Sequence, residues 1–179
     1  MLSLGSAVRS GARCSRPDAR IRHRALLDSF DGIAYNTAVK TLQIVIDTNV
    51  LVSALRSKRG ASFRLLRLLG DSRFEISVSV PLVIEYEKAA KRTVRRGELS
   101  VRDVDAILDF ICAVARHREI YYLWRPLLRD PKDDMVLELA VAGGCDVIVT
   151  YNQKDFTEAE AFGIGILTPK EFLHRIGDV

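Results

Sequence analysis

Cysteine and histidine are scarce in this sequence, with three of each among 179 residues. Cys14, Cys112 and Cys145 are odd in number and form no CxxC pair, which argues against a disulfide framework and a zinc site. No apolar run approaches the roughly 18 residues that a membrane-spanning helix needs. These absences predict a reduced, cytoplasmic protein that binds neither zinc nor a membrane.

Net charge is also limited, because 27 basic residues face 23 acidic ones. Residues 1–40 contain seven basic and three acidic residues, which leaves 20 of each for the remainder. The basic surplus that would favour a nucleic-acid partner therefore lies in the N-terminal segment. Apart from a short helical pattern at 25–30, residues 1–40 lack periodicity. We expect them to form a largely disordered extension, followed by one domain over 41–179.

Short β-branched runs alternate with helical patterns after the extension. Strands are predicted at 42–46, 74–78, 120–124, 147–150 and 164–167. Helices are predicted at 50–55, 62–69, 81–96, 100–115, 134–142 and from 169, with a loop at 152–156. Strands separated by helices imply right-handed crossovers. The sequence therefore predicts an α/β fold with three layers, α/β/α, around a central parallel sheet of four to five strands.

Acidic residues recur where predicted strands end and helices begin. Asp47 follows the first strand in an Asp-Thr-Asn triplet, and Glu85 lies about one turn into the helix after the second. Asp133 and Asp134 open a later helix, and Asp155 follows the strand at 147–150. The carboxyl ends of parallel strands meet at one edge of an open sheet, so these carboxylates should gather there. Mutual repulsion would require a cation, and all-oxygen ligands favour Mg²⁺ or Mn²⁺.

Each acid could also have a purely structural role. Asp47 could cap the following helix, and Glu85 could face solvent. Asp133 and Asp134 could complement the helix dipole, an effect of about 0.3–1 kcal/mol each. However, the triplet after the first strand contains more polar residues than a cap requires. Asp130, Asp133 and Asp134 likewise place three acids within five residues, so we favour the functional interpretation.

Four motifs follow one another in a fixed order. They are VIDTNVL at 45–51, PLVIE at 81–85, DPKDD at 130–134 and VTYN at 149–152. Over residues 42–175 they resemble the signatures of the PIN-domain family, and more narrowly the VapC-like toxins of bacterial toxin–antitoxin pairs. The resemblance implies a PIN-like fold and a metal-dependent endoribonuclease that hydrolyses RNA phosphodiester bonds. It also implies an antitoxin protein as partner and a homodimer.

The resemblance assigns roles to individual residues. Asp47, Glu85 and Asp133 take the places of the metal-binding acids, with Mg²⁺ or Mn²⁺ as cofactor. Thr48 and Asn49 take the places of polar residues that orient the first acid or the attacking water.

The fourth family acid usually follows the Val-Thr-x element directly, where this chain has Asn152 instead. Asp155, three residues later, is the candidate for the missing carboxylate and is included among the catalytic residues. Thr150, Asn152 and Asp134 complete the supporting set. If Asp155 does not replace the fourth acid, a second metal site is weakened.

Basic residues also follow a helical spacing on the helix that contains Glu85. They are Lys88, Lys91, Arg92, Arg95 and Arg96, at positions i, i+3, i+4, i+7 and i+8. Such a stripe could follow an RNA phosphate backbone toward the metal. A solvated helix face would produce the same spacing, so both interpretations stay open.

Three other functions fit part of the pattern. A HAD-type phosphatase also places an aspartate after its first strand, but its DxD motif would need an acid where this chain has Asn49. A receiver-like phosphoacceptor module needs an acid after its third strand, where this chain has Trp124, Arg125 and Pro126. A PIN fold that has lost catalysis and binds RNA or protein is the third alternative, suggested by Asn152.

Overall fold

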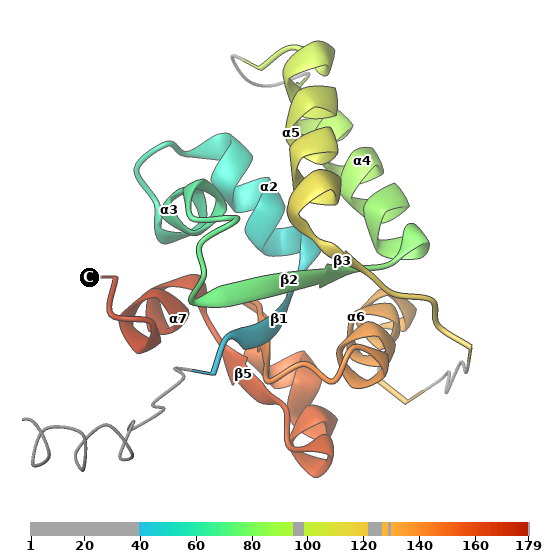
Figure 1. The fold of residues 1–179 in the computed structure, drawn as a ribbon. Helices are drawn as coiled ribbons and strands as arrows, with labels where there is room; N and C mark the ends of the chain where they lie inside the picture. Colours follow the sequence, from blue (N-terminus) through green and yellow to red (C-terminus); the bar gives the residue numbers. More distant parts are fainter. Residues whose placement is uncertain (1–39, 95–98, 122–126, 129, 179) are drawn as a thin grey trace, which may run out of the picture. The chain divides into compact units, whose positions relative to one another are not determined.

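The computed structural model describes residues 40–94, 99–121, 127–128 and 130–178 of the chain (Figure 1). The predicted N-terminal extension, including the helical pattern at 25–30, lies outside the described residues. So do Arg95 and Arg96, the last two residues of the basic stripe.

Five parallel strands form one sheet in the order β3-β2-β1-β4-β5. The strands are β1 (Leu42–Ile46), β2 (Phe74–Val78), β3 (Arg116–His117), β4 (Val147–Val149) and β5 (Gly165–Leu167). Residues 44–46 of β1 and all of β4 are buried, as expected for central strands covered on both faces. The predicted α/β class with a parallel sheet is confirmed.

Helices cover both faces of this sheet (Figure 1). They are α2 (Thr48–Arg56), α3 (Ala61–Arg67), α4 (Val80–Val94), α5 (Val101–Val114), α6 (Pro131–Ala142), α7 (Pro169–Arg175) and the 3₁₀ helix η1 (Gln153–Phe162). The connections through α2–α5 step from β1 toward β3. The connection through α6 then crosses back from β3 to β4, and the one through η1 continues in the same direction from β4 to β5. Right-handed crossovers running in opposite directions place these two groups on opposite faces, which gives the predicted three layers.

Local sequence explains several helix starts. Ser100 and Asp103 form a capping box at α5, and Thr168 and Glu171 form another at α7. Asp130 accepts a hydrogen bond from the Lys132 amide and caps α6, where proline occupies the first helical position. These caps fix where the helices leave the sheet.

The position of the third strand was predicted incorrectly. The strand is Arg116–His117, not 120–124, and the Arg118 amide donates to the Val78 carbonyl at 2.8 Å just beyond it. The chain therefore enters the sheet as soon as α5 ends. Ile120 and Tyr121 lie outside the strand, and residues 122–124 are not described. The apolar run at 120–124 suited a strand, but pairing with β2 depends on contacts that the local pattern does not contain.

The segment predicted as a loop at 152–156 begins a 3₁₀ helix instead. The segment is kinked at Phe156, whose φ of −120° and ψ of 25° are not helical, and Phe156 and Ala159 are its buried residues. Gly163 ends it with a φ of 72°, a conformation that glycine adopts without steric cost.

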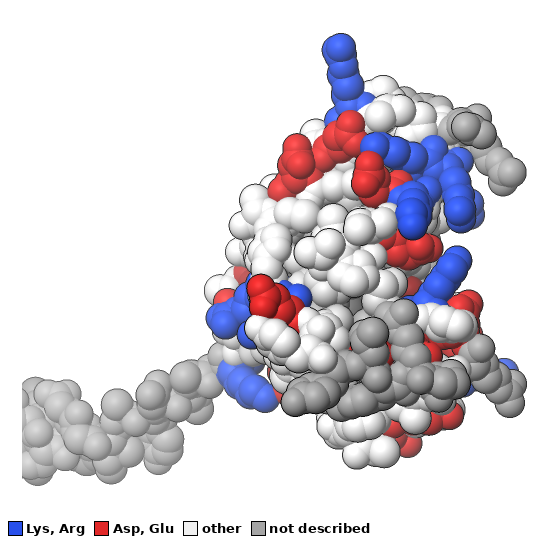
Figure 2. Space-filling view, turned by 90° about the vertical axis from the view of Figure 1, so that its right-hand side faces the viewer, with Lys and Arg blue, Asp and Glu red and all other residues white. Residues whose placement is uncertain are grey.

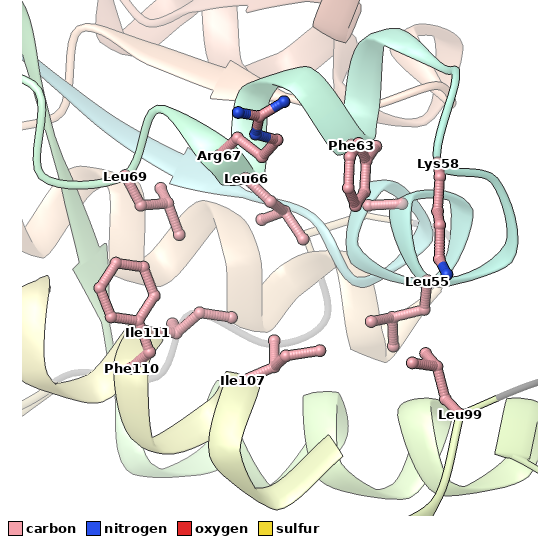
Figure 3. Close-up of a pocket in the computed structure, with 11 residues that line it drawn as sticks. Leu55, Lys58, Phe63, Leu66, Arg67, Leu69, Leu99, Ile107, Phe110 and Ile111 are labelled. Carbon is pink, nitrogen blue, oxygen red and sulfur yellow. The ribbon is translucent and has the colours of Figure 1, made fainter. Parts of the chain in front are cut away.

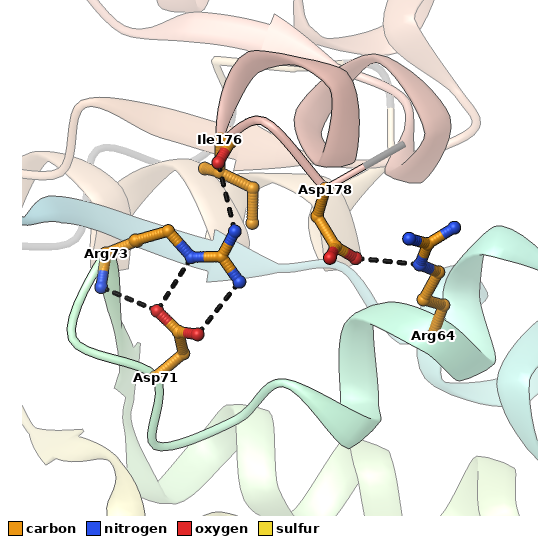
Figure 4. Close-up of polar contacts among 5 residues, drawn as sticks. All are labelled: Arg64, Asp71, Arg73, Ile176 and Asp178. Atoms are coloured by element: carbon orange, nitrogen blue, oxygen red, sulfur yellow. Dashed lines mark hydrogen bonds and ion pairs between the residues drawn. The ribbon is translucent and has the colours of Figure 1, made fainter.

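Polar contacts tie α7 to the amino end of β2 (Figure 4). Arg73 forms an ion pair with Asp71 and donates to the Ile176 carbonyl at 3.1 Å. The hydrogen bonds from Arg73 hold the pKa of Asp71 at about 2. Arg64 of α3 pairs with Asp178 at 2.7 Å. Within the described ranges, no helix combines the length and apolar character that crossing a membrane requires.

Candidate active site

Asp47 stands where β1 ends and α2 begins. It occupies the N-cap position of α2, yet within the described part of the chain its carboxylate makes no capping hydrogen bond. The Thr150 hydroxyl instead donates to Asp47 Oδ2 at 2.7 Å. The side-chain nitrogen of Asn49, Nδ2, donates to the same oxygen at 2.6 Å. The side chain is 6% exposed. The hydrogen bonds that orient this carboxylate therefore come from the side chains of Thr150 and Asn49.

A polar network joins the carboxyl ends of β1 and β4. Asn49 Nδ2 also donates to Thr150 Oγ1 at 3.1 Å, and the Asn152 amide donates to that oxygen at 3.0 Å. The Tyr151 amide donates to Asn49 Oδ1 at 3.3 Å. Thr150 is fully buried, so its hydroxyl fixes the position of Asp47 relative to the loop after β4.

Burial raises the pKa of Asp47 above its ordinary value. The hydrogen bond from Thr150 lowers the pKa, and so do the nearby backbone amides of Asn49 and Thr48. Together these effects are smaller than the effect of burial. The negative charge of Asp155 raises it further. Asp155, in the first turn of η1, therefore lies within electrostatic range of Asp47.

Asp133, in the first turn of α6, faces the same acidic region. Burial raises the pKa of Asp133 to about 6, and the charges of Asp47, Asp130, Asp155 and Asp134 add to the rise. Residues distant in sequence thus act on one carboxyl group. The structure brings Asp47, Asp133 and Asp155 into one electrostatically coupled region at the carboxyl edge of the sheet, which we call the acidic site.

Glu85 of α4 pairs with a lysine. Lys132 Nζ lies 3.6 Å from Glu85 Oε1, and the Glu85 side chain is 19% exposed. The four motifs gave Lys132 no role in the site, although its position directly before Asp133 was a usable signal. The negative charge of Glu85 is therefore paired with the positive charge of Lys132. The carboxylates of the acidic site, in contrast, raise one another's pKa.

Asp134 is turned toward the chain that precedes α6. It is 2% exposed and accepts hydrogen bonds from the amides of Leu127 and Leu128 at 3.2 and 2.7 Å. Both bonds reach Oδ1, while the buried Oδ2 has no hydrogen-bond partner among the described residues. Asp134 thereby holds the entry to α6 in place.

The donor chemistry of the acidic site suits a hard divalent cation, because its like charges raise one another's pKa and its oxygens are the ligands that Mg²⁺ and Mn²⁺ prefer. The side-chain spacing is less favourable. Among the described residues, no three Asp, Glu, His or Cys side chains lie close enough together to bind one metal ion. The residues therefore fit such an ion by charge and atom type, and binding would have to draw the carboxylates together.

The basic stripe of α4 is only partly available for a polyanion. Lys91 forms ion pairs with Glu87 on its own helix and with Asp105 of α5, the latter at 3.3 Å. Lys88 and Arg92 are exposed. Figure 2 shows basic side chains on this face interspersed with acidic ones. The helical spacing correctly predicted an exposed basic face on α4. It did not predict that Asp105 of α5 pairs with Lys91.

The parallel sheet and the acidic site at its carboxyl edge define the class of this protein, an open α/β domain with a carboxylate site. Residues 43–154 match the family model of the PIN domain. The chain belongs to the PIN domain family, as its four motifs suggested. A comparison with curated proteins found no match.

Two solved structures share the fold. One is a chain of VapBC2 from Rickettsia felis, crystallised bound to a DNA fragment from the promoter, with 16% identity and a TM-score of 0.50. That match covers 71% of this chain and 98% of the other. The second is PAE2754 from Pyrobaculum aerophilum, with 16% identity, a TM-score of 0.52, and coverage of 79% and 99%. Identities this low establish a common fold only.

Proposed function

We propose that this protein is a metal-dependent endoribonuclease and the toxin of a toxin–antitoxin pair, acting in the cytoplasm. PIN domains are generally nucleases. The observation that carries the proposal is the acidic site: Asp47, Asp133 and Asp155 come from distant parts of the chain, and both Asp47 and Asp133 have raised pKa values. Such repulsion is costly for folding and is relieved by a bound cation.

The side chains of the site have different proposed roles in metal binding and orientation. Asp47, Glu85 and Asp133 would hold Mg²⁺ or Mn²⁺, and the ion would supply an activated water and stabilise charge on the phosphate. Thr150 and Asn49 orient Asp47 through their hydrogen bonds. Thr48, in the first turn of α2, and Asn152, just before η1, adjoin these groups. Lys132 balances Glu85 until the site is loaded.

Cleavage of a mixed single-stranded RNA pool tests the proposal. Purified protein should cut the pool with Mg²⁺ or Mn²⁺ and should stop when EDTA is added. Sequencing the new ends would reveal the preferred cleavage sequence. Undiminished cleavage in EDTA would refute the metal mechanism, and no cleavage with any divalent ion would favour the alternative below.

Asp155→Asn tests which residue replaces the fourth acid. Because Asp155 acts electrostatically on both Asp47 and Asp133, we expect this variant to need a higher Mn²⁺ concentration for half-maximal cleavage. The expected shift is about tenfold, within the range for residues that support metal ligands. Asn152→Asp is the matched variant and should not increase activity if Asp155 already fills the role. Unchanged metal dependence in Asp155→Asn would remove this residue from the site.

A PIN fold that binds RNA without cutting it is the second candidate. It is favoured by one observation, that the described acids do not yet form a three-ligand group. This alternative predicts tight binding of the RNA pool and no new ends under any metal condition.

We also propose an antitoxin protein as partner, for which Figure 3 shows a suitable surface. A largely apolar cavity of about 290 Å³ lies between α2, α3 and α5, lined by Leu55, Phe63, Leu66, Ile107 and Phe110 among others. Phe110 is 49% exposed, so its apolar ring is available to a partner. Expression of the protein in bacteria should arrest growth, and a co-expressed antitoxin should relieve the arrest less well for Phe110→Ser.

We also propose that the protein forms a homodimer. Light scattering tests this proposal by measuring the mass of the protein in solution.

A further inference from the structure

A second charged surface lies between α3 and α7, away from the basic stripe of α4. Two adjoining grooves of about 410 and 280 Å³ share Arg59, Gly60, Arg64 and Asp178. We call them together the α3–α7 groove. Its cationic lining comprises Lys58, Arg59, Arg64, Arg67 and Lys170, with His174 beside them. These residues come from two segments far apart in the chain, so no helical spacing could predict that they share a surface.

Lys58 and Arg64 have interaction partners, whereas the other arginines and the second lysine of the groove have no acidic partner in the described part of the chain. Asp178 is the acid in its lining, and it pairs with Arg64 (Figure 4). Glu171 adjoins Lys170 in sequence, but its carboxylate accepts hydrogen bonds from Thr168 and Gln153. Arg59, Arg67 and Lys170 are exposed and have no acidic partner among the described residues.

The groove adjoins the acidic site. The Thr150 amide donates to the Leu167 carbonyl at 2.9 Å, so the end of β5 lies beside the residue that orients Asp47. Lys170 follows three residues later, in the first turn of α7. On the α3 side, the hydroxyl groups of Ser62 and Tyr151 are 2.8 Å apart. An extended polymer that leaves the acidic site and passes over Tyr151 would therefore reach the groove next.

We propose that the α3–α7 groove binds the sugar–phosphate backbone of single-stranded RNA beyond the bond that is cut. Unneutralised guanidinium and ammonium groups attract a phosphate chain, and their binding releases counterions. Tyr151, 46% exposed between the two regions, offers a ring on which a base can stack. The proposal rests on the proposed function, because it takes RNA as the substrate of the neighbouring site.

Fluorescence anisotropy with a labelled single-stranded RNA of mixed sequence tests the groove separately from catalysis. EDTA prevents metal-dependent cleavage during the titration. Arg59→Gln combined with Lys170→Gln removes two exposed charges from the groove. Arg102→Gln combined with Arg175→Gln is the matched control, which removes two exposed charges from positions outside the lining of the groove.

The groove variant should bind RNA several-fold more weakly than the wild type at low salt. Each lost phosphate contact changes the slope of log K against log salt by about 0.7 for single strands, so two should reduce it by about 1.4. The control variant should keep the wild-type slope. A wild-type slope in the groove variant, or an equal reduction in both variants, would overturn the assignment.

Two further measurements distinguish RNA from an acidic protein as the ligand, and binding from cleavage. If polyglutamate competes with RNA as strongly, charge for charge, as unlabelled RNA does, the groove serves an acidic protein and the RNA assignment fails. If the wild type binds RNA through the groove but never cuts it with metal, the proposed nuclease fails while the groove assignment stands. If the wild type cuts RNA and the groove variant has an unchanged KM, the groove assignment fails alone.

Discussion

Asp47→Asn should abolish RNA cleavage without destabilising the protein. We expect a loss on the order of 1,000-fold in kcat/KM, equivalent to about 4 kcal/mol of transition-state stabilisation. Asparagine keeps an oxygen that can accept the hydrogen bonds of Thr150 and Asn49. It removes the charge that a metal ion would bind. Cleavage of labelled RNA and thermal unfolding, both on the same preparation, measure the two effects.

The stability part of this prediction follows from the sign of the pKa shift. Burial raises the pKa of Asp47 in the folded protein, so the folded state holds the proton more tightly than the unfolded state does. Without metal, the stability of the wild type should therefore fall as the pH rises from near 4 through the raised pKa. Asp47→Asn should show a smaller fall, because the contribution of Asp133 remains, and should melt at the same or a higher temperature at neutral pH.

Asp146→Asn is a useful contrast, because Asp146 adjoins the opposite end of the same sheet. Burial raises the pKa of Asp146, but hydrogen bonds from Lys40 and the Gln43 amide outweigh this and lower it overall. This variant should lose stability at neutral pH and keep its cleavage activity. A comparable loss of stability in Asp47→Asn would show that Asp47 is a structural residue.

The acidic site was largely predictable because it depends on strand ends. A buried strand that stops in a polar residue places that residue at one edge of the sheet, so Asp47 and Thr150 could be positioned from local pattern alone. The same logic placed Asp133 through the Asp130 cap and Pro131. Short-range signals therefore suffice for residues fixed by the start or end of an element.

Residues whose role depends on distant partners were not predictable in the same way. Lys132 meets Glu85 only because α4 and α6 approach each other in the fold. Lys91 forms an ion pair with Asp105 of the next helix and is therefore less available to a polyanion. The α3–α7 groove combines Arg59 from a loop with Lys170 from the last helix. Pairings of this kind arise from the topology of the sheet, which no single window of sequence contains.

Asp133→Asn should remove both cleavage and a pH-dependent loss of stability. The pKa of Asp133 is about 6 in the folded protein against an ordinary value of 3.8. Between these values the folded state holds more protons, so the metal-free wild type should lose stability as the pH rises from about 4 to 6. At pH near 7.5 in EDTA the variant should melt above the wild type, whereas near pH 4 the two should coincide.

Metal binding supplies an independent measurement of the same residue. Mn²⁺ should raise the melting temperature of the wild type at neutral pH, since a ligand at 100 times its Kd stabilises by about 2.7 kcal/mol. It should have little effect on Asp133→Asn. Asp134→Ala is the neighbouring control: losing its bonds to the Leu127 and Leu128 amides should cost about 1–3 kcal/mol at neutral pH while the stabilisation by Mn²⁺ persists. If Mn²⁺ stabilises Asp133→Asn as much as the wild type, the ion binds elsewhere, and the raised pKa of Asp133 reflects burial among acids that share no metal.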